Sequence, residues 1–360
     1  MKIGIVTLNG YFNYGNRLQN LALQETLLKM GHDVETIRLN KYPERSKAYT
    51  FLRKVYRRIK SIRSTDADIS RKKREEIFRQ FSFANITETS KEYQIQRNIS
   101  ELSNHYDYFV IGSDQVWNPS MNSQSGAFFA DFADQKQKVS YAASFGVDSL
   151  NEDISKLYKS WLKDIPNISV REDAGARLIK KLTGKDVPVL VDPTLLLDKA
   201  EWLKYAKPSP RHSEKYLLTY FLGGIPEKNK IMIEELAKKN SLIVVNLGDS
   251  SEKIDFETGP AEFLDYINRC ELFCTDSFHG VVFSIIFEKP FIVYERVGSE
   301  SMYSRIETLL TKFSLTNRKE SSIDYHGDIF NVNYEHTKRV IEKEKNKSMH
   351  FLVNALNNKG

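Results

Sequence analysis

The stretch that most constrains the fold is residues 270–295, CELFCTDSFHGVVFSIIFEKPFIVYE, which reads as strand, polar turn, short apolar helix and second strand. The turn places Asp276, Ser277 and His279 at the start of the predicted helix. In an open α/β sheet, ligands bind where the carboxyl end of a strand leads into a helix. Free helix N–H groups and a titratable imidazole favour an anionic ligand and proton transfer. We therefore expect a ligand site at His279; the alternative is that His279 only caps or packs the helix.

Strand and helix patterns alternate along most of the chain, which is typical of parallel sheets joined by crossover helices. Strands are expected at residues 2–8, 34–39, 108–112, 139–143, 167–170, 187–191, 216–222 and 242–247. Helices are expected at residues 17–30, 174–181, 227–239, 260–268 and 335–357. Because 360 residues are many for one hydrophobic core, we predict two α/β domains.

The best linker is KPSPRHSE at residues 207–214, which is rich in proline, serine and charge. It divides the chain into an N-terminal domain at residues 1–206 and a C-terminal domain at residues 207–334. The terminal helix, within residues 335–360, is expected to pack back on the N-terminal domain.

The composition is that of a soluble globular protein, with 53 Lys and Arg against 47 Asp and Glu and a net charge of +6. This small excess does not indicate nucleic-acid binding. Cys270 and Cys274 lie in one predicted strand, too far apart for a disulfide, and no zinc-site spacing is present. The start of the chain does not resemble a signal peptide, and no apolar run approaches the about 18 residues of a membrane-spanning helix. We expect a cytoplasmic protein.

A basic segment stands apart at residues 45–74, with twelve Lys or Arg and two Asp. Aliphatic residues and one tyrosine recur in it at helical spacing. A basic amphipathic helix of this kind can lie on an anionic membrane surface, here the inner face of the cell membrane. The alternative is a solvated helical insertion at about residues 45–75 that packs on its own domain. A nucleic-acid arm is disfavoured, because the apolar stripe offers no stacking platform.

Six motifs follow one another along the chain: GYFNYGNRLQNLAL (10–23), GSDQVWNP (112–119), SFG (144–146), SVREDAG (169–175), VDPTLLL (191–197) and TDSFHG (275–280). In this order they resemble the polysaccharide pyruvyl transferases over roughly residues 1–310. The resemblance implies two Rossmann-like domains facing a cleft in a GT-B-like arrangement, with the acceptor on the N-terminal domain and the donor on the C-terminal domain. It also implies transfer of pyruvate from phosphoenolpyruvate to sugar hydroxyls, giving a ketal on a precursor of a bacterial surface polysaccharide. The acceptor would be a sugar or lipid-linked oligosaccharide, and no cofactor or metal is expected.

The donor carries a phosphate and a carboxylate, which guanidinium groups and free backbone N–H groups bind. The residues expected to contact it are Arg171, Gly223, Gly224, Ser277, His279, Arg296 and Arg305. His279 would protonate the departing phosphate or the enol carbon, or hold the phosphate. Asp276 would orient the imidazole or cap the helix. The alternatives are a salt bridge of Arg171 with its acidic neighbours, a plain turn at the glycine pair, and surface positions for the other arginines.

On the acceptor side we expect Asn13, Asn16 and Arg17 in the turn after the first strand. The family often has Asp at the position of Asn16, so another carboxylate would have to act as the base. Asp114 follows a predicted strand and is the substitute that we select, with a turn or cap role as the alternative. Trp117 is expected to stack on the sugar; otherwise it is a core aromatic.

Two other functions remain open from the sequence. One is a glycosyltransferase of the same fold that uses a nucleotide-sugar donor, since fold alone does not separate the two. The other is a non-catalytic module that binds sugar or membrane. The acceptor sugar and the geometry of the ketal are not encoded in any of these motifs.

Overall fold

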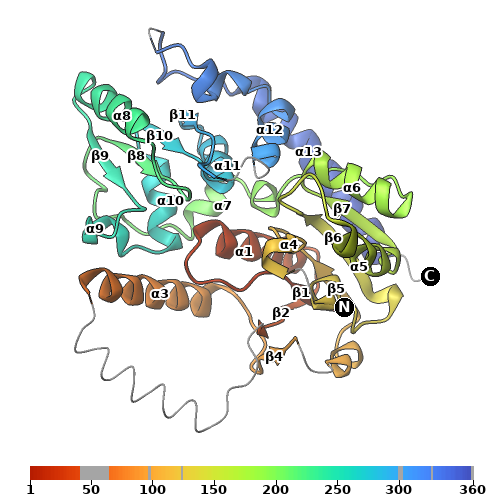
Figure 1. Cartoon of the computed structure of the whole chain (residues 1–360). Helices are drawn as coiled ribbons and strands as arrows, with labels where there is room; N and C mark the ends of the chain where they lie inside the picture. The colour runs from red at the N-terminus through yellow and green to blue at the C-terminus, as the bar shows by residue number, and fades with distance from the viewer. Residues whose placement is uncertain (41–64, 96–98, 123–124, 299–302, 326, 358–360) are drawn as a thin grey trace.

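The computed structural model describes residues 1–40, 65–95, 99–122, 125–298, 303–325 and 327–357. These residues form two parallel α/β sheets, each with helices packed on both of its faces (Figure 1). The predicted fold class, two Rossmann-like domains in a GT-B-like arrangement, is confirmed.

The N-terminal sheet has the strand order β2-β1-β5-β6-β7, and all its pairings are parallel. Its strands are β1 (Lys2–Val6), β2 (Asp33–Thr36), β5 (Tyr108–Ile111), β6 (Lys138–Ala143) and β7 (Asn167–Val170). Strands β5 and β6 are buried along their whole length, as expected for a parallel sheet with both faces covered.

Different helices cover the two faces of this sheet. Helices α5 (Glu152–Lys163) and α6 (Asp173–Thr183) pack on the face that carries Phe109 and Ile111. Helix α1 (Tyr14–Lys29) and the end of α13 (Glu335–Asn357) pack on the opposite face. The other strands of the N-terminal half are β3 (Leu39–Asn40) and β4 (Tyr93–Gln94), which pair as a separate two-stranded sheet. The other helices there are α3 (Asp66–Asn85), α4 (Pro119–Asn122) and α7 (Lys199–Leu203).

The C-terminal sheet has the strand order β11-β10-β8-β9. Its strands are β8 (Tyr216–Tyr220), β9 (Ile243–Asn246), β10 (Leu272–Thr275) and β11 (Phe291–Val293). The helices that go with it are α8 (Glu227–Lys239), α9 (Lys253–Phe256), α10 (Pro260–Arg269), α11 (Phe278–Ile286) and α12 (Ser304–Lys312). Because β9 and β10 lie on opposite sides of β8, the strand order reverses at the carboxyl ends of β8 and β10, where open α/β sheets bind ligands.

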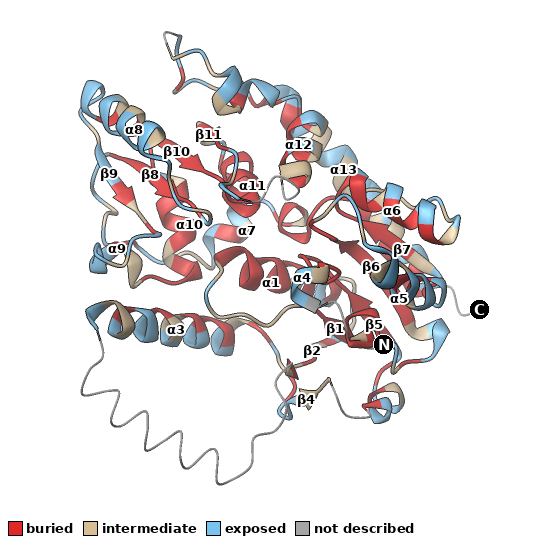
Figure 2. Ribbon diagram, viewed as in Figure 1, coloured by how far each residue is buried: buried red, intermediate tan, exposed pale blue. Residues whose placement is uncertain are grey.

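Helix α1 joins the two domains. Every residue from Tyr14 to Gln24 is buried, and α1 lies at the centre of the molecule (Figure 2). The Tyr14 ring stacks on Phe263 of α10 at a centroid distance of 4.2 Å, with Phe78 of α3 and Tyr220 of β8 each at 5.2 Å. One hydrophobic core therefore spans both domains, and it holds the ends of their strands in a defined relation.

Helix α13 connects the two halves at the end of the chain. Val340 and Ile341, near its start, pack against the core that the domains share. Near its end, Leu352, Ala355 and Leu356 belong to the core beneath the N-terminal sheet. Among the helices of the described ranges, none combines the length and apolarity needed to cross a bilayer.

Some local expectations differ from the structure. Residues 187–191 form a single bridge, between Val189 and Val170, instead of a strand. Cys270 caps α10 and only Cys274 lies in a strand, and burial raises the pKa of both thiols to about 12. The cysteines are therefore core residues without a reactive thiolate.

Most of the basic segment predicted to reach a membrane lies outside the described residues, which resume at Thr65. Residues 65–74 cap and begin α3. There Arg74 is buried and donates hydrogen bonds to the carbonyl oxygens of Leu247 and Phe256, both at 2.9 Å. This arginine therefore attaches α3 to the C-terminal domain.

Candidate active site

Three basic side chains gather around the ring of Phe278 where the domains meet. Arg171 follows β7, and His279 and Arg305 lie in the first turns of α11 and α12. The guanidinium carbon of Arg171 is 4.3 Å from the centre of the Phe278 ring, and that of Arg305 is 5.9 Å from it. All three side chains are buried. The structure thus brings together three of the residues predicted to bind the donor.

Several nitrogen atoms of these side chains have no hydrogen-bond partner. Within the described part of the chain, this is true of Nε and Nη2 of Arg171, Nε of Arg305 and Nε2 of His279. Buried polar groups in native proteins nearly always have a partner, so unpaired ones indicate the place of a ligand or water. Guanidinium groups only donate, and the ligand that suits this cluster is therefore an anion with several acceptor oxygens.

Asp114 faces this cluster from the N-terminal domain. It follows β5 with φ of +63°, in the left-handed region, and accepts a hydrogen bond from Nδ2 of Asn16 at 3.1 Å. Its Oδ1 lies 3.7 Å from Nη2 of Arg171. Burial raises the pKa of Asp114, but the charges of Arg171 and His279 and the hydrogen bond from Asn16 outweigh burial, so the pKa lies below its ordinary value. Asp114 is therefore ionised at neutral pH and able to accept a proton.

Asp192 is a central residue of the site that the sequence analysis did not select. Its Oδ2 accepts a hydrogen bond from Nη1 of Arg171 at 2.6 Å and lies 3.6 Å from Nε2 of His279. Ser113 and Thr194 donate further hydrogen bonds to the same carboxylate. Burial raises the pKa of Asp192, but His279 and Arg171 outweigh it and hold the pKa well below its usual range. The available signal was its position in VDPTLLL, directly after a short apolar run.

Gly15 determines how closely α1 approaches His279. A Cβ atom at Gly15 would overlap the imidazole ring of His279. Only glycine therefore permits this contact, through which the N-terminal domain supports the imidazole of the C-terminal domain.

Replacing Gly15 with alanine is expected to lower the free energy of unfolding by about 1–3 kcal/mol, because a buried Cβ would displace His279 or α1. At an unhindered helical position the same change would stabilise the protein by about 0.5–1 kcal/mol. Urea unfolding of Gly15→Ala, His279→Gly and the double variant measures how much of the lost stability comes from overlap between the new Cβ atom and the imidazole ring. The double variant should lose less than the sum of the single variants; simple additivity would contradict the overlap.

Asp276 has neither of the two roles expected of it. Its carboxylate accepts hydrogen bonds from the backbone N–H groups of Leu222 at 2.7 Å and Gly223 at 2.9 Å. Ser277 caps α11 instead, with its Oγ accepting from the N–H of Gly280 at 3.3 Å. The N–H of Gly223 is therefore already bonded within the protein, and a contact of Gly223 with the donor stays a prediction.

Arg296 also binds Asp276, with its Nε 3.3 Å from Oδ2. A Cβ at Gly223 would overlap the Arg296 side chain, so glycine permits the close packing of these two residues. A donor-binding role of Arg296 stays a prediction.

Two acceptor-side predictions are wrong because the side chains are buried. Trp117 is fully buried, stacks on Phe129 at 5.3 Å and donates its indole N–H to the carbonyl of Phe128. Arg17 is also fully buried, and its guanidinium binds Glu88 at 3.0 Å and the carbonyl of Leu8 at 2.8 Å. Trp117 is thus a core aromatic, and Arg17 ties α1 to its surroundings.

A cavity of about 590 Å³ lies beside Asp114 on the N-terminal domain. Asn13 and Asn16, both expected on the acceptor side, line it together with Asp114. Asp114 therefore lies between the basic cluster and a cavity large enough for a sugar ring.

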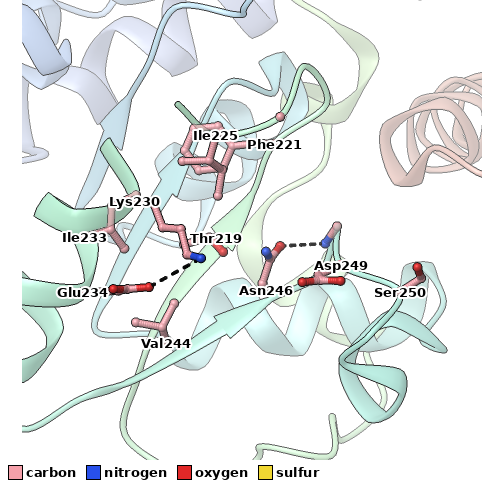
Figure 3. A pocket seen from close by; sticks show the side chains of 12 residues that line it. Thr219, Phe221, Ile225, Lys230, Ile233, Glu234, Val244, Asn246, Asp249 and Ser250 are labelled. Carbon is pink, nitrogen blue, oxygen red and sulfur yellow. Dashed lines mark hydrogen bonds and ion pairs between the residues drawn. The ribbon is translucent and has the colours of Figure 1, made fainter. Parts of the chain in front are cut away.

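A second cavity, of about 370 Å³, lies in the C-terminal domain (Figure 3). It is bounded by α8, by the carboxyl ends of β8 and β9 and by the loops that follow them. Gly224 lines it, whereas Arg171, His279 and Arg305 do not. The cavity also contains an ion pair between Lys230 and Glu234, with 4.0 Å between the charged atoms. Gly224 is therefore separate from the basic cluster with which the sequence analysis grouped it.

In the described ranges, no group of three or more His, Cys, Asp or Glu side chains is placed to hold a metal ion. The arrangement has two guanidinium groups, which can bind an anion, and two titratable side chains, Asp114 and His279, of the types that can transfer protons.

Comparison with solved structures finds similar chains at low sequence identity. A functionally uncharacterised protein from Klebsiella pneumoniae is 16% identical, covers 84% of this chain and 98% of its own, and has a TM-score of 0.41. The UDP-GlcNAc 2-epimerase of Methanocaldococcus jannaschii is 13% identical over 95% and 99% of the two chains, with a TM-score of 0.47. An E. coli heptosyltransferase with ADP-2-deoxy-2-fluoro heptose is 11% identical over 87% and 99%, with a TM-score of 0.38.

Comparison with curated proteins gives no match. A family model described as polysaccharide pyruvyl transferase matches residues 13–296, which include Asp114, Arg171, Asp192 and His279. The chain belongs to the polysaccharide pyruvyl transferase family.

Proposed function

We propose that this protein transfers pyruvate from phosphoenolpyruvate to hydroxyl groups of a sugar in a polysaccharide precursor, forming a pyruvate ketal. The observation that carries the proposal is the set of buried nitrogen atoms of Arg171, Arg305 and His279 that have no hydrogen-bond partner in the described residues. Phosphoenolpyruvate has a phosphate and a carboxylate close together. Two guanidinium groups with free N–H donors match these two anions.

The reaction divides into an addition and then a substitution at the carbon that bears the phosphate. One sugar hydroxyl loses its proton and bonds to this carbon, while a proton adds to the terminal enol carbon. A second hydroxyl then forms the second C–O bond as the bond to phosphate breaks, and the phosphate leaves with the second proton. The balanced products are a cyclic ketal and inorganic phosphate.

Asp114 is the group proposed to accept the hydroxyl proton. Its low pKa makes it a weak base in the free protein, because it faces Arg171 and His279. An anionic donor would offset these positive charges and raise the pKa of Asp114. The carboxylate would then become more basic when the donor is bound. His279 would either protonate the donor or hold its phosphate.

The first test is calorimetric titration with phosphoenolpyruvate, together with phosphate release in the presence of cell-envelope glycans. We expect His279→Gln to lower the rate of phosphate release by about 10²–10⁴-fold if the imidazole transfers a proton, with unchanged donor affinity. Reduced donor affinity would instead assign His279 to phosphate binding. His336→Gln, at an exposed position of α13, is the matched control and should behave as wild type.

A parallel titration with UDP- and ADP-sugars tests the alternative donor. Binding of a nucleotide sugar without binding of phosphoenolpyruvate would overturn the proposal and favour a glycosyltransferase.

A further inference from the structure

The cavity beside Asp114 has the features of a site for an uncharged sugar ring. Three aromatic side chains, Tyr11, Phe12 and Phe128, line it. Sugar rings bind aromatic side chains through their apolar C–H faces, so an available ring face is the first requirement.

The three aromatic rings differ in whether a ring face is free to stack on a ligand. Phe128 is buried. Tyr11 has the guanidinium carbon of Arg79 4.1 Å from its ring centre and that of Arg17 at 5.5 Å, so cations already cover it. Phe12 is 56% exposed, and in the described part of the chain neither a ring nor a cation stacks on it. Phe12 is therefore the aromatic residue of this cavity that can receive a ligand.

The charges around the cavity disfavour an anionic ligand. Its described lining has the carboxylates of Glu75, Glu92 and Asp114 and a single cationic side chain, Arg79. Arg79 is already paired with Glu75, with 2.7 Å between Nη2 and Oε1. The described lining thus has a net charge of −2, from three carboxylates and one guanidinium. Arg171 and His279 offset the charge of Asp114, and Arg79 offsets that of Glu75, so the remaining negative charge of the described lining is that of Glu92, which repels carboxylate- or phosphate-bearing sugars.

The polar groups of the lining suit hydroxyl groups. Carboxylates accept hydrogen bonds from hydroxyls, and asparagine amides both donate and accept. Asn13 supplies an amide whose Oδ1 accepts from the N–H of Asn16, and Asp114 supplies a carboxylate. The amides of Asn9 and Asn16 also line the cavity but are bonded within the protein. The carboxylate that would accept the proton is therefore in the same cavity as the exposed aromatic ring.

We propose that this cavity binds a neutral pyranose ring of the acceptor, with its C–H face on Phe12 and a hydroxyl at Asp114. The assignment of this ring as the acceptor rests on the pyruvyl transfer proposed above. Phe12 then selects for the sugar by stacking, and the carboxylates exclude uronic acids and phosphorylated sugars. Phe12 takes the stacking role that the sequence analysis gave to Trp117.

The test uses the full chain and a set of methyl glycosides of glucose, galactose, mannose and N-acetylglucosamine, each titrated by saturation-transfer NMR. Methyl glucuronide and methyl galacturonide are the matched anionic probes. We expect at least one neutral glycoside to bind, and its uronate counterpart to bind at least about tenfold more weakly because of like-charge repulsion. Phe12→Ala should weaken binding about 2- to 12-fold, and Phe12→Trp should restore it.

Phe83→Ala is the matched control, because Phe83 is 93% exposed on α3 and does not line the cavity. It should leave glycoside binding unchanged. The proposal is overturned if no neutral glycoside binds, if uronates bind as tightly, or if Phe12→Ala binds as wild type does. Phosphoenolpyruvate binding is measured separately on each variant. Glycoside binding that depends on Phe12, without donor binding, would contradict the pyruvyl-transfer proposal and leave the sugar site standing.

Discussion

Replacing Asp192 with asparagine is expected to lower the free energy of unfolding by about 3–5 kcal/mol at pH 7. The reason is that Arg171 is buried and its Nη1 lies 2.6 Å from Oδ2 of Asp192. Removing the nearer partner of this buried ion pair leaves the Arg171 charge compensated only by the more distant Asp114, at 3.7 Å, and by Glu172. The loss is measured by urea unfolding. Asp186→Asn is the matched control, since this side chain is 85% exposed and pairs with Lys180 at the surface. A loss below about 1 kcal/mol for Asp192→Asn would contradict the role given to the pair.

The same variant should remove part of the pH dependence of stability. The folded pKa of Asp192 lies below its unfolded value, because His279 and Arg171 outweigh burial. Asp192 therefore stabilises the protein above the unfolded pKa of about 3.9, and this stabilisation is lost as the pH falls toward the folded pKa. The difference between wild type and Asp192→Asn should be largest near pH 7 and shrink by pH 3. A constant difference across this range would assign the loss to packing alone.

Replacing Arg305 with glutamine is expected to weaken phosphoenolpyruvate binding about 10- to 100-fold without lowering stability. Burial lowers the pKa of Arg305 to about 10, and the like charge of Arg171 adds to the decrease. In the free protein, burial and the charge of Arg171 therefore destabilise the charged form of Arg305, and an anionic donor would reduce this destabilisation. Loss of a charged hydrogen bond to the donor accounts for the expected about 1.5–3 kcal/mol of binding.

Two measurements on Arg305→Gln test this prediction. Calorimetric titration with phosphoenolpyruvate gives the donor affinity, and urea unfolding without ligand gives the stability. Arg177→Gln serves as the matched control, because Arg177 is exposed on α6. Stability should stay within about 0.5 kcal/mol of wild type or rise. Wild-type affinity in Arg305→Gln would place the donor away from this guanidinium. Reduced stability together with unchanged affinity would make Arg305 a structural residue.

Local patterns were sufficient for much of the fold. The short apolar runs at residues 108–112, 139–143 and 167–170 predicted buried parallel strands, and the structure has β5, β6 and β7 there. Residues at the carboxyl ends of strands were the natural site candidates, and three of them, Asp114, Arg171 and His279, converge. Such predictions succeed because strand alternation and strand ends are properties of short windows of sequence.

Burial was the main source of error. Trp117 and Arg17 are residue types typical of binding sites, yet both side chains are in the core and their polar atoms are paired there. Phe12, like Trp117, lies in the segment that follows a predicted strand, yet its side chain is exposed. Nothing in the neighbouring sequence separates these cases, because exposure depends on which helices and loops pack over a residue.

The sequence by itself determined the family, the alternation of strands and helices and most of the chemical groups of the site. The tertiary structure decided which of those groups meet. Asp192 joins Arg171 to His279, Gly15 admits the imidazole, and Asp276 turns instead to the backbone of residues 222–223. These relations link segments far apart in the chain and arise only when α1 packs between the two sheets. For that reason His279 and Asp114 could be selected from the sequence, while Asp192, which joins His279 to Arg171, could not.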